Sequence, residues 1–300
     1  MLVLVALLSG AVIFFMTLPL PPPNGDNLLK APIFVKRWGG SGTSPGQFDE
    51  ASSIELSSTG DVYVAGHENR VQVFDYQGNL KFIFGTSGST DGKFQHPHGL
   101  AMDRRTNTLY VGDQENHRIQ VFDAQGQFIW KIMNSDLVHI HDIGIDPNQG
   151  FIYAPDYEVD HLQKINPSTG EVVWKRPDLP GGWGVSVDSQ GDVYLAVTDA
   201  RELHKIDPTT GQTIKQIGGF SGAQGITGVY VDRHDLVYVV DAPTKEVRIY
   251  DTDLVLLATW DLSDIAGSIS KPEDITISDH DGDIYIADSE SNFVFWLKRE

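Results

Sequence analysis

The 300-residue sequence contains no cysteine. Disulfide bridges, cysteine-ligated zinc, iron–sulfur clusters and thiol nucleophiles are therefore all excluded. Basic residues are scarce, since 22 lysines and arginines stand against 41 aspartates and glutamates, which gives a formal net charge of −19 at pH 7. A surface that binds nucleic acid needs clustered lysine and arginine to displace counterions from the phosphates. The composition therefore argues against nucleic acid as a partner.

The N-terminal segment lacks charge altogether. Residues 1–23 contain no charged side chain, and the apolar stretch 2–20 is interrupted only by serine, glycine, threonine and proline. As a helix this stretch would span about 28 Å, close to the roughly 30 Å hydrocarbon core of a bilayer. It predicts a secretory signal peptide or an uncleaved membrane anchor, followed by a stiff proline-rich spacer; a misassigned start codon is the third interpretation. Both of the first two interpretations place the remaining chain outside the cytoplasm, either anchored on the extracytoplasmic side or secreted.

Helical periodicity is absent after residue 33, and a repeated β-rich pattern takes its place. A tyrosine recurs at one fixed position in six segments, at spacings of 41 to 47 residues. Each tyrosine follows a short apolar run and precedes two further alternating runs, with turns rich in Gly, Asn and Asp between them. Four short strands, repeated six times, predict an all-β, six-bladed β-propeller. The tyrosines are Tyr63, Tyr110, Tyr153, Tyr194, Tyr238 and Tyr285.

The two ends of the repeat array are complementary. The sixth repeat has three strands before Glu300, whereas 34–38 forms a spare strand ahead of the first repeat. We expect 34–38 to become the outermost strand of the sixth blade and to pair with 293–297, which would close the ring and remove two exposed edges. The predicted domains are a signal peptide or anchor with its spacer at 1–23, a linker at 24–31 and the propeller at 32–300.

Three segments carry a family resemblance. The runs 47–54, 94–103 and 113–123 contain a Gly-x-Phe, a Pro-x-Gly that enters the first strand, and an Asn-x-Arg-Ile-Gln-x-Phe third strand. With these motifs the chain resembles the NHL-repeat family. The second repeat matches almost throughout, the first matches well, and the third to sixth match in strand pattern. The resemblance implies a six-bladed propeller, in agreement with the independent repeat count.

The alternation of strands predicts where a binding site would lie. The first strand of each propeller blade lines the central channel, so the residue just before it should border the channel mouth. This mouth belongs to face T, which we define as the face carrying the loops between the second and third strands of each blade. The opposite face B carries the turns between first and second and between third and fourth strands. The predicted ring is Ser52, His98, His141, Trp183, Thr227 and Glu273.

Two histidines of this ring suggest a metal site. His98 lies in His-Pro-His and His141 in His-Ile-His, at equivalent positions of adjacent blades. Imidazole nitrogens are common ligands of zinc and other divalent metals. One hypothesis is therefore a metal bound by both, and the other is two hydrated histidines that hydrogen-bond to loop carbonyls. The candidate third ligands are Glu273, Asp142, His96 and His139.

Loops on face T supply further candidates. An aspartate follows the repeated tyrosine by three residues in four blades, at Asp113, Asp156, Asp241 and Asp288. These carboxylates either cap backbone N–H groups, or Asp113 and Asp156 flank a bound ligand together with Tyr157. Trp183 is either a stacking platform for a sugar or an aromatic group or a plug of the channel.

Two functions of different classes follow. The first is an extracytoplasmic NHL-type scaffold that binds a protein, peptide or glycan at the mouth on face T, with or without a metal. The alternative is a metal-dependent lyase or hydrolase, for which no catalytic residue is assigned. Among NHL proteins, the peptidyl-hydroxyglycine amidating lyases take zinc ligands from histidines in Pro-His-Gly entries, which His98 matches. In that weaker resemblance the other two ligand positions fall on Trp183 and Glu273, the loop arginine falls on Gln114, and the loop tyrosine lies one place from Tyr157.

Overall fold

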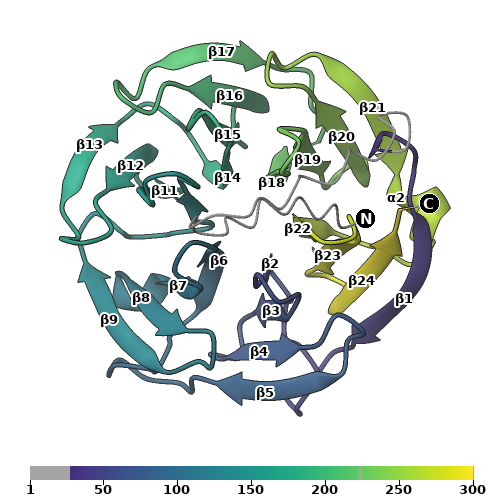
Figure 1. The fold of residues 1–300 in the computed structure, drawn as a ribbon, viewed down its shortest axis with the longest axis horizontal. Coiled ribbons are helices and arrows are strands. Elements are labelled where there is room, and N and C mark those ends of the chain that lie inside the picture. Colours follow the sequence, from purple (N-terminus) through teal and green to yellow (C-terminus); the bar gives the residue numbers. More distant parts are fainter. Residues whose placement is uncertain (1–27, 223–224, 300) are drawn as a thin grey trace, which may run out of the picture.

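The computed structural model describes residues 28–222 and 225–299. These residues form six four-stranded sheets around a central channel (Figure 1). The prediction of an all-β, six-bladed propeller is confirmed. The predicted signal peptide or anchor lies outside the described residues, and so do residues 24–27 of the predicted linker. Within the described ranges, no helix is both long enough and apolar enough to cross a bilayer.

All six sheets share one design, in which antiparallel strands follow one another from the channel outward (Figure 1). The first three sheets contain β2 (Ser53–Leu56), β3 (Val62–Ala65), β4 (Val71–Phe74) and β5 (Leu80–Phe84); β6 (Pro97–Asp103), β7 (Thr108–Asp113), β8 (Arg118–Asp123) and β9 (Phe128–Met133); and β10 (Gly144–Ile145), β11 (Ile152–Asp156), β12 (His161–Ile165) and β13 (Val172–Arg176).

The other three sheets contain β14 (Gly182–Val187), β15 (Val193–Val197), β16 (Glu202–Ile206) and β17 (Thr213–Ile217); β18 (Ile226–Val231), β19 (Val237–Asp241), β20 (Glu246–Tyr250) and β21 (Leu256–Asp261); and β22 (Pro272–Ile277), β23 (Ile284–Asp288), β24 (Phe293–Lys298) and β1 (Ile33–Gly39). Two short helical turns interrupt the pattern, a 3-10 turn η1 (Gln114–Asn116) and the helix α2 (Leu262–Ala266).

The first described strand belongs to the last blade. β1 pairs antiparallel with β24, in a register that sets Phe34 opposite Leu297 and Trp38 opposite Val294. The Trp38 ring then packs against Phe74 of the first blade and Tyr285 of the sixth, at centroid distances of 5.9 and 6.1 Å. One side chain of β1 therefore contacts both blades at this junction.

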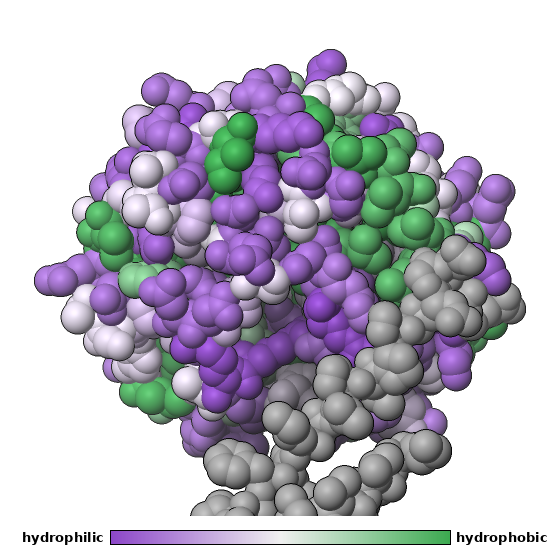
Figure 2. Space-filling view, turned by 45° about the horizontal axis from the view of Figure 1, so that its top comes forward, coloured by the Kyte–Doolittle hydropathy of each residue, from purple (hydrophilic) through white to green (hydrophobic). Residues whose placement is uncertain are grey.

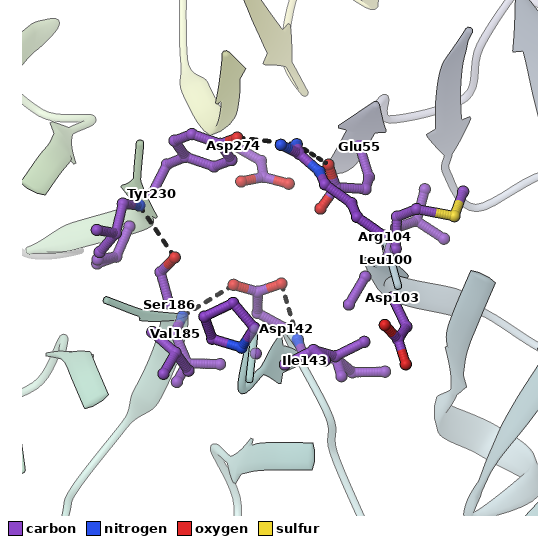
Figure 3. A pocket seen from close by; sticks show the side chains of 18 of the residues that line it. Glu55, Leu100, Asp103, Arg104, Asp142, Ile143, Val185, Ser186, Tyr230 and Asp274 are labelled. Atoms are coloured by element: carbon purple, nitrogen blue, oxygen red, sulfur yellow. Dashed lines mark hydrogen bonds and ion pairs between the residues drawn. The ribbon is translucent and has the colours of Figure 1, made fainter. Parts of the chain in front are cut away.

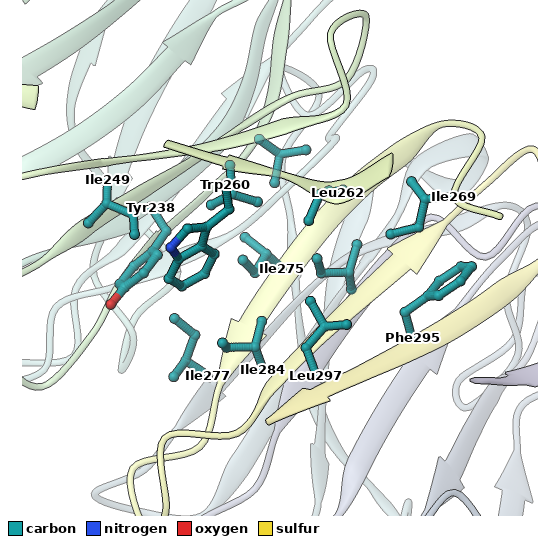
Figure 4. Close-up of a cluster of buried hydrophobic side chains, with 13 residues drawn as sticks. Tyr238, Ile249, Trp260, Leu262, Ile269, Ile275, Ile277, Ile284, Phe295 and Leu297 are labelled. Carbon is teal, nitrogen blue, oxygen red and sulfur yellow. The ribbon is translucent and has the colours of Figure 1, made fainter. Parts of the chain in front are cut away.

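The core consists of hydrophobic layers between neighbouring blades. Because each sheet is covered on both sides, its second strand is almost wholly buried, as the residues of β3 and β11 show. Figure 4 shows one layer, where Tyr238 and Trp260 of the fifth blade meet Ile275, Ile284 and Phe295 of the sixth. The outer strands are different. Several of their apolar side chains are exposed, among them Ile129, Val173, Ile214 and Leu256. Figure 2 shows separate hydrophobic areas on an otherwise largely hydrophilic face of the molecule.

The tyrosine that recurs in every repeat has a structural role. All six tyrosines are at most 5% exposed. Several hydroxyl groups reach a partner at the edge of the core: the hydroxyl of Tyr63 donates to the carbonyl of Ala124 at 2.8 Å, and that of Tyr194 to the Asp188 carboxylate at 2.9 Å. A phenol fits this place because its ring fills the layer while its hydroxyl group is satisfied.

Candidate functional site

The largest members of the predicted ring meet at one end of the channel. The ring centroids of His98 and His141 are 4.8 Å apart, and His141 stacks on Trp183 at 3.7 Å. His98 Nε2 lies 3.7 Å from Glu273 Oε1. Since His98 and Glu273 come from the second and sixth blades, which are not adjacent, these side chains meet across the channel. The two small members, Ser52 and Thr227, are buried beside them.

His98 and His141 belong to a row of five imidazoles along this mouth. The consecutive ring centroids are 3.9, 6.0, 4.8 and 4.6 Å apart. His67 was not identified from the sequence, although it occupies the face T loop of the first blade and an alignment of the six loops would have shown it. Its Nδ1 lies 3.0 Å from Glu50 Oε2. The row runs His67, His96, His98, His141 and His139.

Most of this row is uncharged at neutral pH. Burial lowers the pKa of His96 to about 3, assisted by the neighbouring imidazoles. Burial also lowers the pKa values of His139 and His141. Glu273 behaves differently: burial raises its pKa, but the hydrogen-bonding imidazole of His98 and the ammonium group of Lys271 outweigh this, so that the pKa lies below its usual value. The mouth therefore combines the neutral imidazoles of His96, His139 and His141 with the ionised carboxylate of Glu273.

The hydrogen bonds of the mouth leave acceptors without donors. His98 Nδ1 lies 2.6 Å from the carbonyl oxygen of His141, so Nδ1 must carry the proton. The other ring nitrogen of His98, Nε2, faces the Glu273 carboxylate, with 3.7 Å between Nε2 and Oε1. Among the described residues, Glu273 Oε2 and His141 Nδ1 are buried and have no hydrogen-bond partner. Lys271 Nζ lies 3.7 Å from Glu273 Oε2. Buried polar groups are normally paired, so a donor placed in the mouth would be stabilised by these atoms.

The face T aspartates are held inside their loops. Asp113 and Asp156 are fully buried. Asp113 accepts hydrogen bonds from the Gln95 backbone N–H at 2.7 Å and from the Arg118 side chain at 2.7 Å. Asp156 accepts hydrogen bonds from two successive backbone N–H groups, of Val138 and His139. These carboxylates fix the loops behind the mouth. Tyr157, by contrast, reaches the mouth, with its ring 5.6 Å from that of Trp183.

A separate cavity of about 170 Å³ occupies the channel toward face B, and none of the mouth residues lines it. Figure 3 shows Asp142 and Asp274 on opposite walls of this cavity, with Glu55 and Arg104 beside them. Asp142, which the sequence offered as a metal ligand, instead accepts hydrogen bonds from the N–H groups of Ile143 and Val185. Asp274 in the sixth blade likewise accepts hydrogen bonds from the N–H group of Ile275 and from that of Ile54 in the first blade. Each aspartate thus ties its own blade to the next.

The buried carboxyls of the channel predict an unusual dependence of stability on pH. Burial raises the pKa of Asp142 well above its usual value, and Asp274 across the channel adds to this effect. Burial raises the pKa of Asp274 from 3.8 to about 7, and its carboxyl neighbour Glu55 also raises it. Between about pH 4 and about pH 7, Asp274 keeps its proton in the folded chain and has lost it in the unfolded chain. Asp274 therefore makes the free energy of unfolding fall as the pH rises from about 4 to about 7.

We expect Asp274→Asn to remove this slope. Because the amide does not titrate, the stability difference between wild type and variant should shrink as the pH rises from about 4 to about 7. Urea unfolding of both proteins at a series of pH values measures this difference in the free energy of unfolding. Asp253→Asn, a change of the same kind at an exposed turn on face B, is the matched control. A difference between wild type and Asp274→Asn that stays constant across this range would contradict the prediction.

Comparisons with known proteins agree with this architecture. The NHL repeat family model matches residues 94–122, and a family described as outer membrane protein assembly factor BamB matches residues 159–253. The chain is 31% identical over 140 residues to protein brain tumor of Drosophila melanogaster, covering 46% of this chain and 13% of that protein. It is 32% identical over 88 residues to human NHL repeat-containing protein 3, covering 28% and 25%. The aligned segments thus span at most a quarter of these relatives.

Solved structures show the same fold at low sequence identity. A streptogramin B lyase superposes with a TM-score of 0.64 at 13% identity, covering 88% of this chain and 98% of that one. A catalytically inactive virginiamycin B lyase from Staphylococcus aureus gives a TM-score of 0.63 at 12% identity, covering 86% and 83%. At such identity the likeness extends to the fold alone.

Proposed function

We propose that this six-bladed β-propeller, of which residues 94–122 match the NHL repeat model, is a recognition scaffold that binds a protein or peptide ligand at the channel mouth on face T. The observation that carries the proposal is the group of stacked rings there. Trp183 lies against His141 at 3.7 Å and beside Tyr157 at 5.6 Å, and neither Trp183 nor Tyr157 is fully buried. Tryptophan and tyrosine held in this way are typical of residues that dominate binding energy at interfaces.

A photo-crosslinking experiment tests this proposal. A photoreactive phenylalanine analogue replaces Tyr157 on face T or, as the matched control, Thr209 in an exposed turn on face B. In cells that make the full chain, we expect a discrete protein adduct from position 157 and none from position 209. The adduct should disappear when Trp183→Ala is added. Equal labelling from both faces would contradict the proposal, whereas an adduct whose mass falls after glycosidase digestion would favour a glycan ligand.

The metal-dependent lyase is the second candidate, and one observation favours it. His98 Nε2 and Glu273 Oε1 face each other at 3.7 Å, as two ligands of one ion could. Catalytic zinc, however, usually has three protein ligands, and in the described part of the chain no three His, Asp or Glu side chains are grouped to hold an ion. We therefore derive no reaction step. One equivalent of zinc retained after dialysis, and lost in His98→Ala, would favour this candidate over the scaffold.

We also propose that the propeller works outside the cytoplasm, tethered to a membrane or secreted. The uncharged apolar stretch 2–20 supports this proposal. Fractionation of cells with carbonate extraction, together with N-terminal sequencing, would separate the cases. An intact N-terminus in the soluble cytoplasmic fraction would overturn the proposal.

A further inference from the structure

We propose that the mouth on face T receives a lysine or arginine side chain of its ligand, with Trp183 against the aliphatic stem and Glu273 at the cationic head. This inference rests on the proposed function and names the chemistry of the partner. It follows from two features of the mouth: the unpaired acceptor on Glu273 and the aromatic wall.

The first feature is the unpaired hydrogen-bond acceptor on Glu273. Glu273 Oε2 is a buried acceptor that has no hydrogen-bond partner among the described residues, and Lys271 Nζ lies 3.7 Å from it. An ammonium or guanidinium group carries several N–H donors and no acceptor. Placed beside Glu273, it would donate to Oε2 and compensate the buried charge. An acidic ligand group would instead leave this acceptor unpaired and face a like charge.

The aromatic wall supplies the contact for the stem. Trp183 is held edge-on to Tyr157 and stacked on His141, so its orientation is fixed before a ligand arrives. Lysine and arginine lay their methylene groups along apolar surfaces while the charged head stays in a polar place. A cation close to a tryptophan face gains further electrostatic attraction.

Two cations of the chain itself lie near this place. Lys271 Nζ is 3.7 Å from Glu273 Oε2, and its side chain is 25% exposed at the rim, so it can move outward when a ligand cation enters. Arg104 lies in the channel wall, where it is bound to Glu55, Asp279 and Tyr230. The net charge of −19 also favours encounter with a basic partner.

Selection from a random peptide library tests the inference. Peptides displayed on phage are selected on the immobilised full chain, and on Trp183→Ala in parallel. We expect the peptides specific to wild type to be enriched in lysine or arginine. Replacing the shared lysine by norleucine, or the shared arginine by citrulline, should weaken binding roughly tenfold or more, because a charged hydrogen bond is lost.

Three variants define the role of the carboxylate. Glu273→Gln should weaken the same peptides roughly tenfold or more, whereas Glu273→Asp should keep the preference for basic peptides. Glu171→Gln, the same change at an exposed turn on face B, should leave binding unchanged. Thermal unfolding checks that each variant is folded.

The outcomes separate the two proposals. Selected peptides that depend on Trp183 but carry no basic residue would overturn this inference and leave the scaffold standing. Basic peptides that bind Glu273→Gln as tightly as wild type would also overturn it. If wild type enriches no peptides beyond those of Trp183→Ala, both proposals fail.

Discussion

Replacing Arg118 by alanine is expected to lower the free energy of unfolding by about 3–5 kcal/mol, the cost of breaking a buried ion pair from one side. Arg118 Nε lies 2.7 Å from Asp113 Oδ2, and the two side chains are 3% and 0% exposed. The guanidinium also donates to the backbone carbonyls of Thr90 and Lys93, at 3.1 and 2.9 Å. When the guanidinium group is removed, the buried Asp113 carboxylate and these two carbonyl groups each lose a hydrogen-bond donor.

Urea unfolding at neutral pH measures this effect. Lys175→Ala is the control, because Lys175 pairs with Asp136 at 3.0 Å on the surface, where the side chains are 39% and 50% exposed. Such a pair contributes about 0–1 kcal/mol. If the two variants lose similar stability, the Arg118 network does not organise the second blade as described.

Trp38→Ala is expected to destabilise the protein by about 3–5 kcal/mol, as large-to-small changes of buried aromatic residues do. Trp38 is 9% exposed and packs against Phe74 and Tyr285. Because its strand is the outermost of the sixth blade, the cavity would open at the junction between the first and last repeats.

The control for this variant lies on the same strand. Val35 is 39% exposed, so Val35→Ala should change stability by about 0.5 kcal/mol or less. Urea unfolding compares the two variants, and limited proteolysis shows whether Trp38→Ala releases β1 first. Equal stability of Trp38→Ala and Val35→Ala would refute the importance of this contact.

The repeat architecture was predictable because its signals are local. Alternating apolar residues, turn residues and one tyrosine per repeat specify a strand pattern within each stretch of 41 to 47 residues. The same alternation placed His98, His141, Trp183 and Glu273 at equivalent positions. The sequence alone did not decide between capping and ligand binding for Asp113 and Asp156, since either use needs the same carboxylate. Their complete burial and backbone partners show that they hold the loops.

By itself, then, the sequence determined the strand count, the blade number and which residues share a ring, because these follow from short-range periodicity. Only the tertiary structure showed that His141 stacks on Trp183, that His98 meets Glu273 across the channel, and that Asp142 and Asp274 face one cavity. Those contacts join side chains that lie far apart along the chain. They depend on rotamers and on the width of the channel, which no pattern within a single repeat encodes.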